Sequence, residues 1–243
     1  MRRVLSLLIA TSLSFAVACS VAAAAVPEQA MKAMERGDYK TALGELRPLA
    51  EKGDAEAQFL LGMLHDSGKG VAQDQAAAAS WYRKAAKQQH VMSQIYLGIL
   101  LYSGQGVKQD AAEAARWFQS AAEAGNDQAQ FYLGAMCERG AGVPADTSEA
   151  IRWLRKSAAQ RNTRAMGLLA TTLFGRSRDS QDLVDAYAWS HLAAELDPVQ
   201  ATTASRGVIE KYCSGDQKKR GKALMAEWKR KWADESKTRG AAR

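Results

Sequence analysis

The side chains that most often bind metals are scarce in this chain. Its 243 residues include three histidines, His65, His90 and His191. No two of them have the i, i+4 spacing of a zinc-binding helix, and the motif H-E-x-x-H is absent. Glu195 lies four residues after His191, but two ligands without a third make a weak metal site. The histidines therefore predict no metal.

Signatures of an activated nucleophile are also absent. Neither G-x-S-x-G nor S-x-x-K occurs in the sequence. The glycine pairs follow predicted helices and lack the G-K-[ST] ending of a phosphate-binding loop. We expect no catalytic residue and no cofactor, and we expect that the chain is not an enzyme.

A period of 36 residues organises the body of the chain. Tryptophan, glycine, leucine and aspartate all recur in phase with it. The recurring positions are Leu61, Gly62, Gly68, Gly70, Asp74, Trp81, Leu97, Gly98, Gly104, Gly106, Asp110, Trp117, Leu133, Gly134, Gly140, Gly142, Asp146, Trp153, Leu169, Asp182 and Trp189. Catalytic sites are not built as evenly spaced copies, so these residues predict a structural repeat.

Each unit is predicted to contain two α-helices and a glycine loop. Leu61 and Leu64 lie on one stripe of the first helix. Gly68 suits a left-handed C-terminal cap, and Gly70 lets the chain reverse. Asp74 then stands where the second helix needs an N-cap. Such a pair buries its second face only by stacking on a neighbour.

Two finer contacts are expected within the unit. A glycine inside a helix, such as Gly62, destabilises it by about 1 kcal/mol relative to alanine. We expect Trp81 of the paired helix to lie across that bare backbone in compensation. Asp110 with Glu113 matches a D-x-x-E capping box, and the following unit repeats the pattern.

The first unit carries the string Ala57-x-x-x-Leu61-Gly62, then Gly68-Lys69-Gly70-Val71, Asp74, Ala78, Trp81-Tyr82 and Ala85-Ala86. This string resembles the Sel-one-like repeat (SLR), a bacterial relative of the tetratricopeptide repeat. The resemblance covers residues 54–198 in four units of 36 residues. It implies an all-α fold, a right-handed superhelical solenoid of antiparallel helix pairs, and a monomer.

The resemblance is incomplete at some positions. In the fourth unit Ala170 replaces the helix glycine and Arg176-Ser177-Arg178 replaces the glycine loop. His65 and Cys137 fill a position where the family usually has tyrosine, and we expect both to fill the core. Cys137 and Cys213 lie about two units apart, so a disulfide between them is the less favoured alternative.

Additional helices are expected at both ends of the repeats. Residues 26–53 resemble a leading tetratricopeptide-type pair that turns at Gly37-Asp38, and residues 199–243 predict basic capping helices. The last helix, expected to end near Ala233, places five residues on one face: Gly221, Leu224, Met225, Trp228 and Trp232. This face either covers the last repeat or contacts a membrane surface or an acidic partner.

The N-terminus is predicted to direct export. Arg2 and Arg3 precede an apolar run and a group of alanines, which together are typical of a signal peptide over residues 1–25. The mature chain would begin at Val26, in the periplasm or secreted. Small residues before Cys19 leave open an alternative, an outer-membrane lipoprotein attached through that cysteine.

The net charge of +7 does not predict nucleic-acid binding. Residues 206–243 hold twelve Lys and Arg against five Asp and Glu, whereas residues 4–205 hold nineteen against twenty-one. The repeat body is therefore nearly neutral, and a nucleic-acid-binding domain needs a basic face on its body.

An exported scaffold that binds a protein or peptide partner is the function we expect, since solenoids bind through extended surfaces. The resemblance also implies an alternative, a weak penicillin-binding or β-lactam-hydrolysing protein, although the cysteine pairs of that subgroup are missing. The expected partner groove lies on the first helix of each unit, opposite its core stripe. Its candidate residues are Phe59, Met63, Asp66, Ile95, Ile99, Tyr102, Phe131, Ala135 and Glu138. The alternative is that these residues only pack against the adjacent unit.

Overall fold

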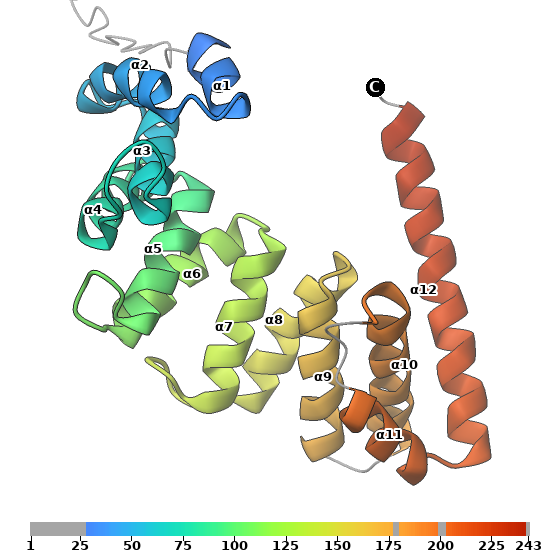
Figure 1. Cartoon of the computed structure of the whole chain (residues 1–243). Coiled ribbons are helices and arrows are strands. Elements are labelled where there is room, and N and C mark those ends of the chain that lie inside the picture. The colour runs from blue at the N-terminus through green and yellow to red at the C-terminus, as the bar shows by residue number, and fades with distance from the viewer. Residues whose placement is uncertain (1–27, 177–179, 199–202, 242–243) are drawn as a thin grey trace, which may run out of the picture.

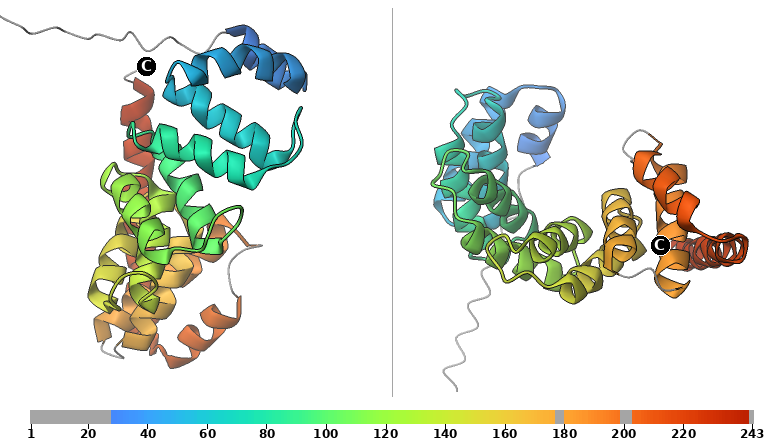
Figure 2. Two further views of the ribbon diagram at one scale, coloured as in Figure 1. Left: turned by 90° about the vertical axis from the view of Figure 1, so that its left-hand side faces the viewer. Right: turned by 90° about the horizontal axis from the view of Figure 1, so that it is seen from below.

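The computed structural model describes residues 28–176, 180–198 and 203–241, which form twelve helices and no strand (Figure 1). The helices are α1 (Glu28–Glu35), α2 (Tyr39–Glu51), α3 (Ala55–Ser67), α4 (Gln75–Ala86), α5 (Val91–Ser103), α6 (Ala111–Glu123), α7 (Asp127–Arg139), α8 (Thr147–Ala159), α9 (Thr163–Arg176), α10 (Ser180–Leu196), α11 (Thr203–Tyr212) and α12 (Gly215–Ala241). Each helix from α1 to α10 packs on the next one, and the stack follows an arc (Figure 2). The predicted helical solenoid is confirmed. The predicted signal peptide and the Cys19 alternative lie outside the described residues.

The glycines and aspartates that recur every 36 residues form the expected helix ends. Gly68 and its equivalents Gly104 and Gly140 have left-handed backbone and close α3, α5 and α7. Asp74 accepts a hydrogen bond from the Ala77 N–H at 2.9 Å, and Asp110 and Asp146 cap α6 and α8 in the same way. These side chains satisfy backbone N–H groups that a helix start leaves unpaired.

The partner of the helix glycine differs from the prediction. A Cβ on Gly62 would lie 2.5 Å from the Tyr82 ring, so the ring of Tyr82, not Trp81, covers the bare backbone. Gly98 faces Phe118 and Gly134 faces Leu154 in the same manner. Trp81 is one residue away, which turns it by about 100° around α4 to a half-buried position beside Lys84.

The prediction that Glu113 completes a capping box with Asp110 is also wrong. Asp110 accepts from the Glu113 N–H at 2.8 Å, but the Glu113 carboxylate does not return to the Asp110 backbone. It accepts instead from the Trp117 indole at 3.1 Å and from Arg83 of the preceding unit at 3.0 Å. The Asp110 N–H is already bonded to the Leu101 carbonyl, so the glutamate is available for a contact between units.

Close backbone approach joins consecutive units. Gly106 has φ +69°, and a Cβ there would lie 2.4 Å from the Gln75 carbonyl carbon at the start of α4. Gly142 meets the start of α6 at 2.3 Å in the same way. The second glycine of each loop therefore permits a turn and a contact with the preceding unit at once.

The fourth unit replaces the N-cap with an ion pair. Asp182 lies inside the first turn of α10 and is buried, so it is not the N-cap that the column suggests. Arg176 donates to both of its carboxylate oxygens, at 3.0 and 2.5 Å. Ser177 and Arg178 of the altered loop lie outside the described residues.

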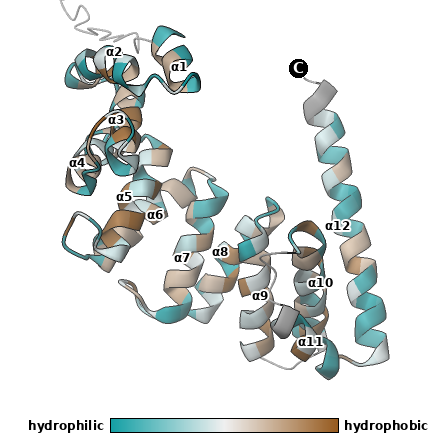
Figure 3. Ribbon diagram, in the orientation of Figure 1, coloured by the Kyte–Doolittle hydropathy of each residue, from teal (hydrophilic) through white to brown (hydrophobic). Residues whose placement is uncertain are grey.

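Helix α12 packs against the end of the repeats and is longer than predicted. It extends to Ala241 rather than to Ala233 and is largely hydrophilic (Figure 3). Its apolar face contacts α10: the Trp228 ring stacks on Trp189 at 3.9 Å, and Gly221 lies against Tyr187. The Trp232 indole donates to the Ala159 carbonyl at 3.0 Å. No described helix is apolar enough over a sufficient length to cross a bilayer.

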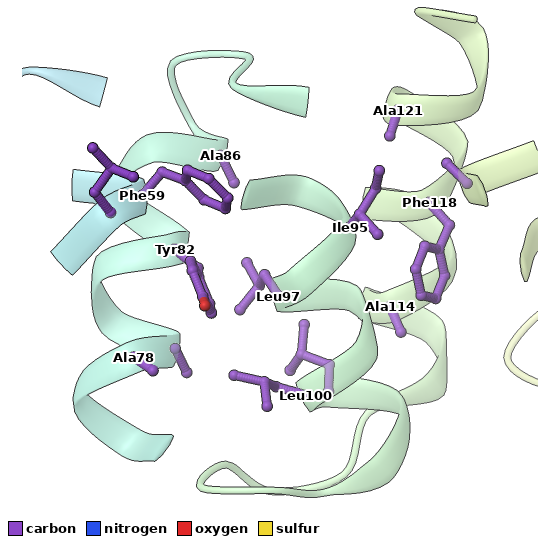
Figure 4. Close-up of a cluster of buried hydrophobic side chains, with 14 of the residues drawn as sticks. Phe59, Ala78, Tyr82, Ala86, Ile95, Leu97, Leu100, Ala114, Phe118 and Ala121 are labelled. Carbon is purple, nitrogen blue, oxygen red and sulfur yellow. The ribbon is translucent and has the colours of Figure 1, made fainter. Parts of the chain in front are cut away.

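Buried side chains fill the space between successive helices. Figure 4 shows Tyr82 of α4 and Leu97 of α5 facing one another, with Phe118 of α6 on the far side of α5. All three are fully buried or nearly so. This core fixes the first helices of the units, α3, α5, α7 and α9, in register along one face of the solenoid.

Candidate partner-binding surface

Chemically reactive side chains are dispersed in the part of the chain that the structure describes. No group of three His, Cys, Asp or Glu residues could hold a metal ion among those residues. His191 lies 3.7 Å from Glu210, while Glu195 pairs with Lys229 of α12, so the sequence pair His191 and Glu195 does not form.

The two described cysteines are free thiols. Cys137 and Cys213 are buried and form no disulfide. Burial raises the pKa of both thiols, because the charged thiolate loses hydration. Cys137 fills the core as expected, and His65 in the same column is half-buried.

Three of the expected groove residues lie in the core. Ile95 is fully buried, and Phe59 and Phe131 are 9% exposed. The Phe59 ring contacts the rings of Tyr82 and Tyr96, at 5.9 and 5.7 Å between centroids. The prediction that Phe59 and Ile95 line a groove is wrong, because stacking of the next unit covers them. Phe131 is mostly buried, but its ring forms part of the wall of a cleft described below.

The remaining candidates are half-buried. They are Met63, Asp66, Ile99, Tyr102, Ala135 and Glu138. Glu138 accepts a hydrogen bond from the Thr172 hydroxyl at 2.6 Å, so one of its carboxylate oxygens already joins α7 to α9. Partner binding by these residues stays a prediction.

Neighbouring apolar residues on the first helices extend this surface. Tyr96 precedes Ile99 by one helical turn, and Tyr132 and Leu168 occupy the same position in the next two units. The first-helix strip consists of the half-buried residues Met63, Tyr96, Ile99, Tyr102, Tyr132 and Leu168. The same 36-residue register that revealed the core could have revealed Tyr96, Tyr132 and Leu168.

A cleft of about 490 Å³ lies at the N-terminal end of the strip, between α1 and α5. Met34, Tyr39, Met63, Tyr82 and Tyr96 give it apolar and aromatic walls. Glu35, Asp66 and Lys69 supply its charged side chains. Two carboxylates against one ammonium make this α1–α5 cleft acidic.

A second cleft, of about 500 Å³, lies at the C-terminal end of the strip. Phe131 and Leu168 are among its apolar walls, and Arg139 and Arg164 are its charged residues. The Arg164 guanidinium lies 4.4 Å from the centre of the Phe131 ring, within cation–π distance. This α7–α11 cleft is basic, so the charge changes sign along the strip.

Comparisons with known proteins point to one family. A family model described as the Sel1 repeat matches residues 55–90, 91–126, 127–162 and 163–198, which together are more than half of the chain. No curated protein matches the chain.

Two solved structures are similar to the chain. The first is c5321, described as a protective antigen present in uropathogenic Escherichia coli strains and displaying an SLR fold. It is 33% identical, with a TM-score of 0.72 over 82% of this chain and 43% of that one. A Sel1 repeat protein from Oxalobacter formigenes is 27% identical, with a TM-score of 0.63 over 69% of each chain. The chain thus spans less than half the length of c5321.

Proposed function

Because the chain belongs to the Sel1 repeat family, we propose that it is a non-catalytic scaffold of the cell envelope that binds a segment of a protein partner along its first-helix strip. Sel1 repeat proteins generally bind protein partners. The proposal concerns which surface of this chain binds and in which compartment.

One observation supports the binding surface above all others. Half-buried apolar side chains recur at equivalent positions along the first helices: Tyr96, Tyr132 and Leu168 on α5, α7 and α9, and Met63 and Ile99 on α3 and α5. An extended apolar stripe with polar edges is typical of a surface that receives another chain.

The two clefts support a bound segment of defined direction. The α1–α5 cleft carries net negative charge and the α7–α11 cleft carries Arg139 and Arg164. A partner segment with a basic residue near one end and an acidic residue near the other is complementary in one orientation only, and its reversal brings like charges together.

The proposal that the chain is exported rests on residues 1–25 alone. Their basic start, apolar run and small residues favour a signal peptide, and removal of that segment would leave a chain that begins at Val26. The intact mass of the protein from the producing cell tests this proposal. A mass matching residues 26–243 supports it, a lipid-sized addition at Cys19 indicates a membrane anchor, and retention of residues 1–25 contradicts cleavage.

The binding surface is tested by capture from an envelope extract with matched variants. Ile99→Glu introduces a charge into the middle of the strip, and Ser80→Glu introduces the same charge at an exposed position of α4. We expect the strip variant to lose its captured partner and the α4 variant to keep it, provided both melt as the original chain does. Equal capture by the two variants would contradict binding through the strip.

A further inference from the structure

A tyrosine hydroxyl in the wall of the α1–α5 cleft has no hydrogen-bond partner. Tyr82 is fully buried, and its hydroxyl forms no hydrogen bond within the structure. A buried hydroxyl without a partner destabilises a fold, because it has given up its hydrogen bonds to water. Its retention therefore calls for an explanation outside the packing of the free protein.

The other repeats show that the packing does not need this hydroxyl. Phe118 and Leu154 occupy the positions equivalent to Tyr82, and each covers the helix glycine of its unit at a similar distance. Neither side chain has a polar atom. In the fourth unit the equivalent residue is Ser190, whose hydroxyl donates to the Tyr187 carbonyl at 3.0 Å. The ring of Tyr82 is thus structural, while its unpartnered hydroxyl has no counterpart in the other three units.

Two carboxylates face the same cleft without a cationic partner. Within the described residues, neither Glu35 nor Asp66 forms an ion pair, and the Asp66 carboxylate has only a 3.4 Å contact from the Gln75 amide. Desolvation raises the pKa of Tyr82, and the nearby negative charge of Asp66 raises it further. The Tyr82 hydroxyl and the Asp66 carboxylate thus belong to the lining of one cleft, and both are hydrogen-bond acceptors.

The aromatic walls of the cleft also suit a cation. Lys69 already places its ammonium 5.3 Å from the centre of the Tyr39 ring at the edge of the cleft. In the α7–α11 cleft a guanidinium, that of Arg164, lies over Phe131, which is the equivalent of Phe59 two units earlier. A positive group on an aromatic ring is thus an arrangement that this face of the solenoid adopts within its own chain.

We propose that the α1–α5 cleft binds an arginine side chain of the partner segment, with Asp66 and the Tyr82 hydroxyl as acceptors and the rings of Tyr39 and Tyr96 as apolar walls. A guanidinium fits because it is planar, carries five N–H donors and stacks on aromatic faces. This inference rests on the proposed function and specifies the chemistry of one part of the bound segment.

Lys69 has a defined role under this proposal. Its ammonium lies at the edge of the cleft and repels an incoming guanidinium, while its exposed, flexible side chain can move aside. Lys69→Gln should therefore strengthen binding of a cationic ligand by about threefold, the effect of one screened surface charge. A cleft that binds an anion would show the opposite change.

The test uses the purified protein and the peptide acetyl-Leu-Arg-Leu-amide, followed by nuclear magnetic resonance titration. We expect the shifts to concentrate in α3, α4 and α5 around the cleft. Replacement of arginine by citrulline, which keeps the shape and removes the charge, should weaken binding by about tenfold, the usual effect of losing a charge-assisted hydrogen bond. Replacement by lysine should weaken it less.

Two variants examine the acceptors. Tyr82→Phe should lower the affinity by about fivefold through loss of one hydrogen bond, while the melting temperature stays equal or rises. Asp66→Asn should lower it by about tenfold. Tyr187→Phe is the matched control, since Tyr187 is a buried tyrosine of α10 that lies outside both the cleft and the first-helix strip and stacks on His191, and it should leave the affinity unchanged.

Several results would overturn the arginine site. They are absence of peptide binding at millimolar concentration, equal affinity for the citrulline peptide, and an affinity unchanged by Tyr82→Phe. None of them bears on capture of a partner through Ile99, which is a different part of the strip, so the two proposals fail separately.

Discussion

Equivalent residues in successive units form similar but not identical hydrogen bonds. The equivalent residues Gln58, Gln94 and Gln130 contact the preceding helix: each side-chain amide donates to a carbonyl in the last turn of that helix, at 3.0 to 3.4 Å. The amide oxygens differ, however. Those of Gln58 and Gln130 accept from Gln88 and Gln160, whereas that of Gln94 is buried without a partner.

Ala124 occupies the position of the missing donor, so Ala124→Gln should stabilise the protein. The new amide would meet both the Gln94 oxygen and the Gln89 carbonyl, as Gln88 meets Gln58 and the Gly53 carbonyl. We expect the free energy of unfolding to rise by about 1 kcal/mol, the net value of a hydrogen bond to a buried acceptor. Urea denaturation measures this free energy.

Ala112→Gln, at an exposed position of α6, is the control and should change stability by less than about 0.5 kcal/mol. Equal shifts in both variants would contradict the proposed bond.

Thiol reactivity provides a second prediction for individual residues. Burial raises the pKa of the Cys137 and Cys213 thiols, so the reactive thiolate is depleted at pH 8. We expect slow alkylation by iodoacetamide in the folded protein and fast alkylation of both thiols in denaturant. A third reactive thiol in denaturant would show that Cys19 is retained and unmodified, which contradicts both cleavage before Val26 and lipidation.

At the scale of helices, the sequence predicted caps better than contacts. Asp74 and Gly68 stand beside the helix ends that they close, so their roles depend on local backbone chemistry alone. The partner of Gly62 depends on the rotation of α4 about its axis, and a rotation of one residue separates Tyr82 from Trp81. The column Asp54, His90 and Asn126, which caps α3, α5 and α7, was missed because a histidine interrupts an otherwise ordinary series.

Contacts between units are tested by adding one methyl group. Gly106→Ala would place a Cβ 2.4 Å from backbone of α4 and hold alanine at φ +69°. We expect a loss of about 2–4 kcal/mol, which combines overpacking with left-handed strain. Gly44→Ala is the control because Gly44 lies within α2 with open space around it, and helix propensity predicts a gain of about 0.5–1 kcal/mol. A similar small effect at both positions would mean that the units do not approach as closely as described.

Across the whole molecule, the 36-residue period predicted the solenoid, whereas the clefts at its ends were not predicted. The period reports what all units share, and that is the core and the loops. The α1–α5 cleft depends on α1, α2 and the hydroxyl of Tyr82, which are features of one end only. The groove positions predicted for Phe59 and Ile95 are wrong because one helix has two buried sides in a stack, and a single amphipathic stripe accounts for only one of them.

The role of α12 is tested on the whole chain. Its contacts with α10 and with Arg161 in the turn between α8 and α9 predict that the C-terminal repeat depends on it. A chain that ends after Ser214 should show faster amide exchange in α10 and unchanged exchange in α3 and α4, since solenoid units are stabilised mainly by their neighbours. Exchange in α10 that is unaffected by the truncation would mean that α12 is an appendage available for a membrane or a partner.

Partner binding by the first-helix strip is tested most directly by photo-crosslinking in the producing cell. A photoreactive amino acid replaces Tyr102 in the middle of the strip, and in a matched strain it replaces the exposed Ser80 of α4. We predict a discrete crosslinked protein from position 102 and none from position 80. The crosslink from position 102 should be lost when the same chain also carries Ile99→Glu. The same crosslinks from both positions, or none from position 102 while the protein is folded and abundant, would contradict a scaffold that binds through this strip.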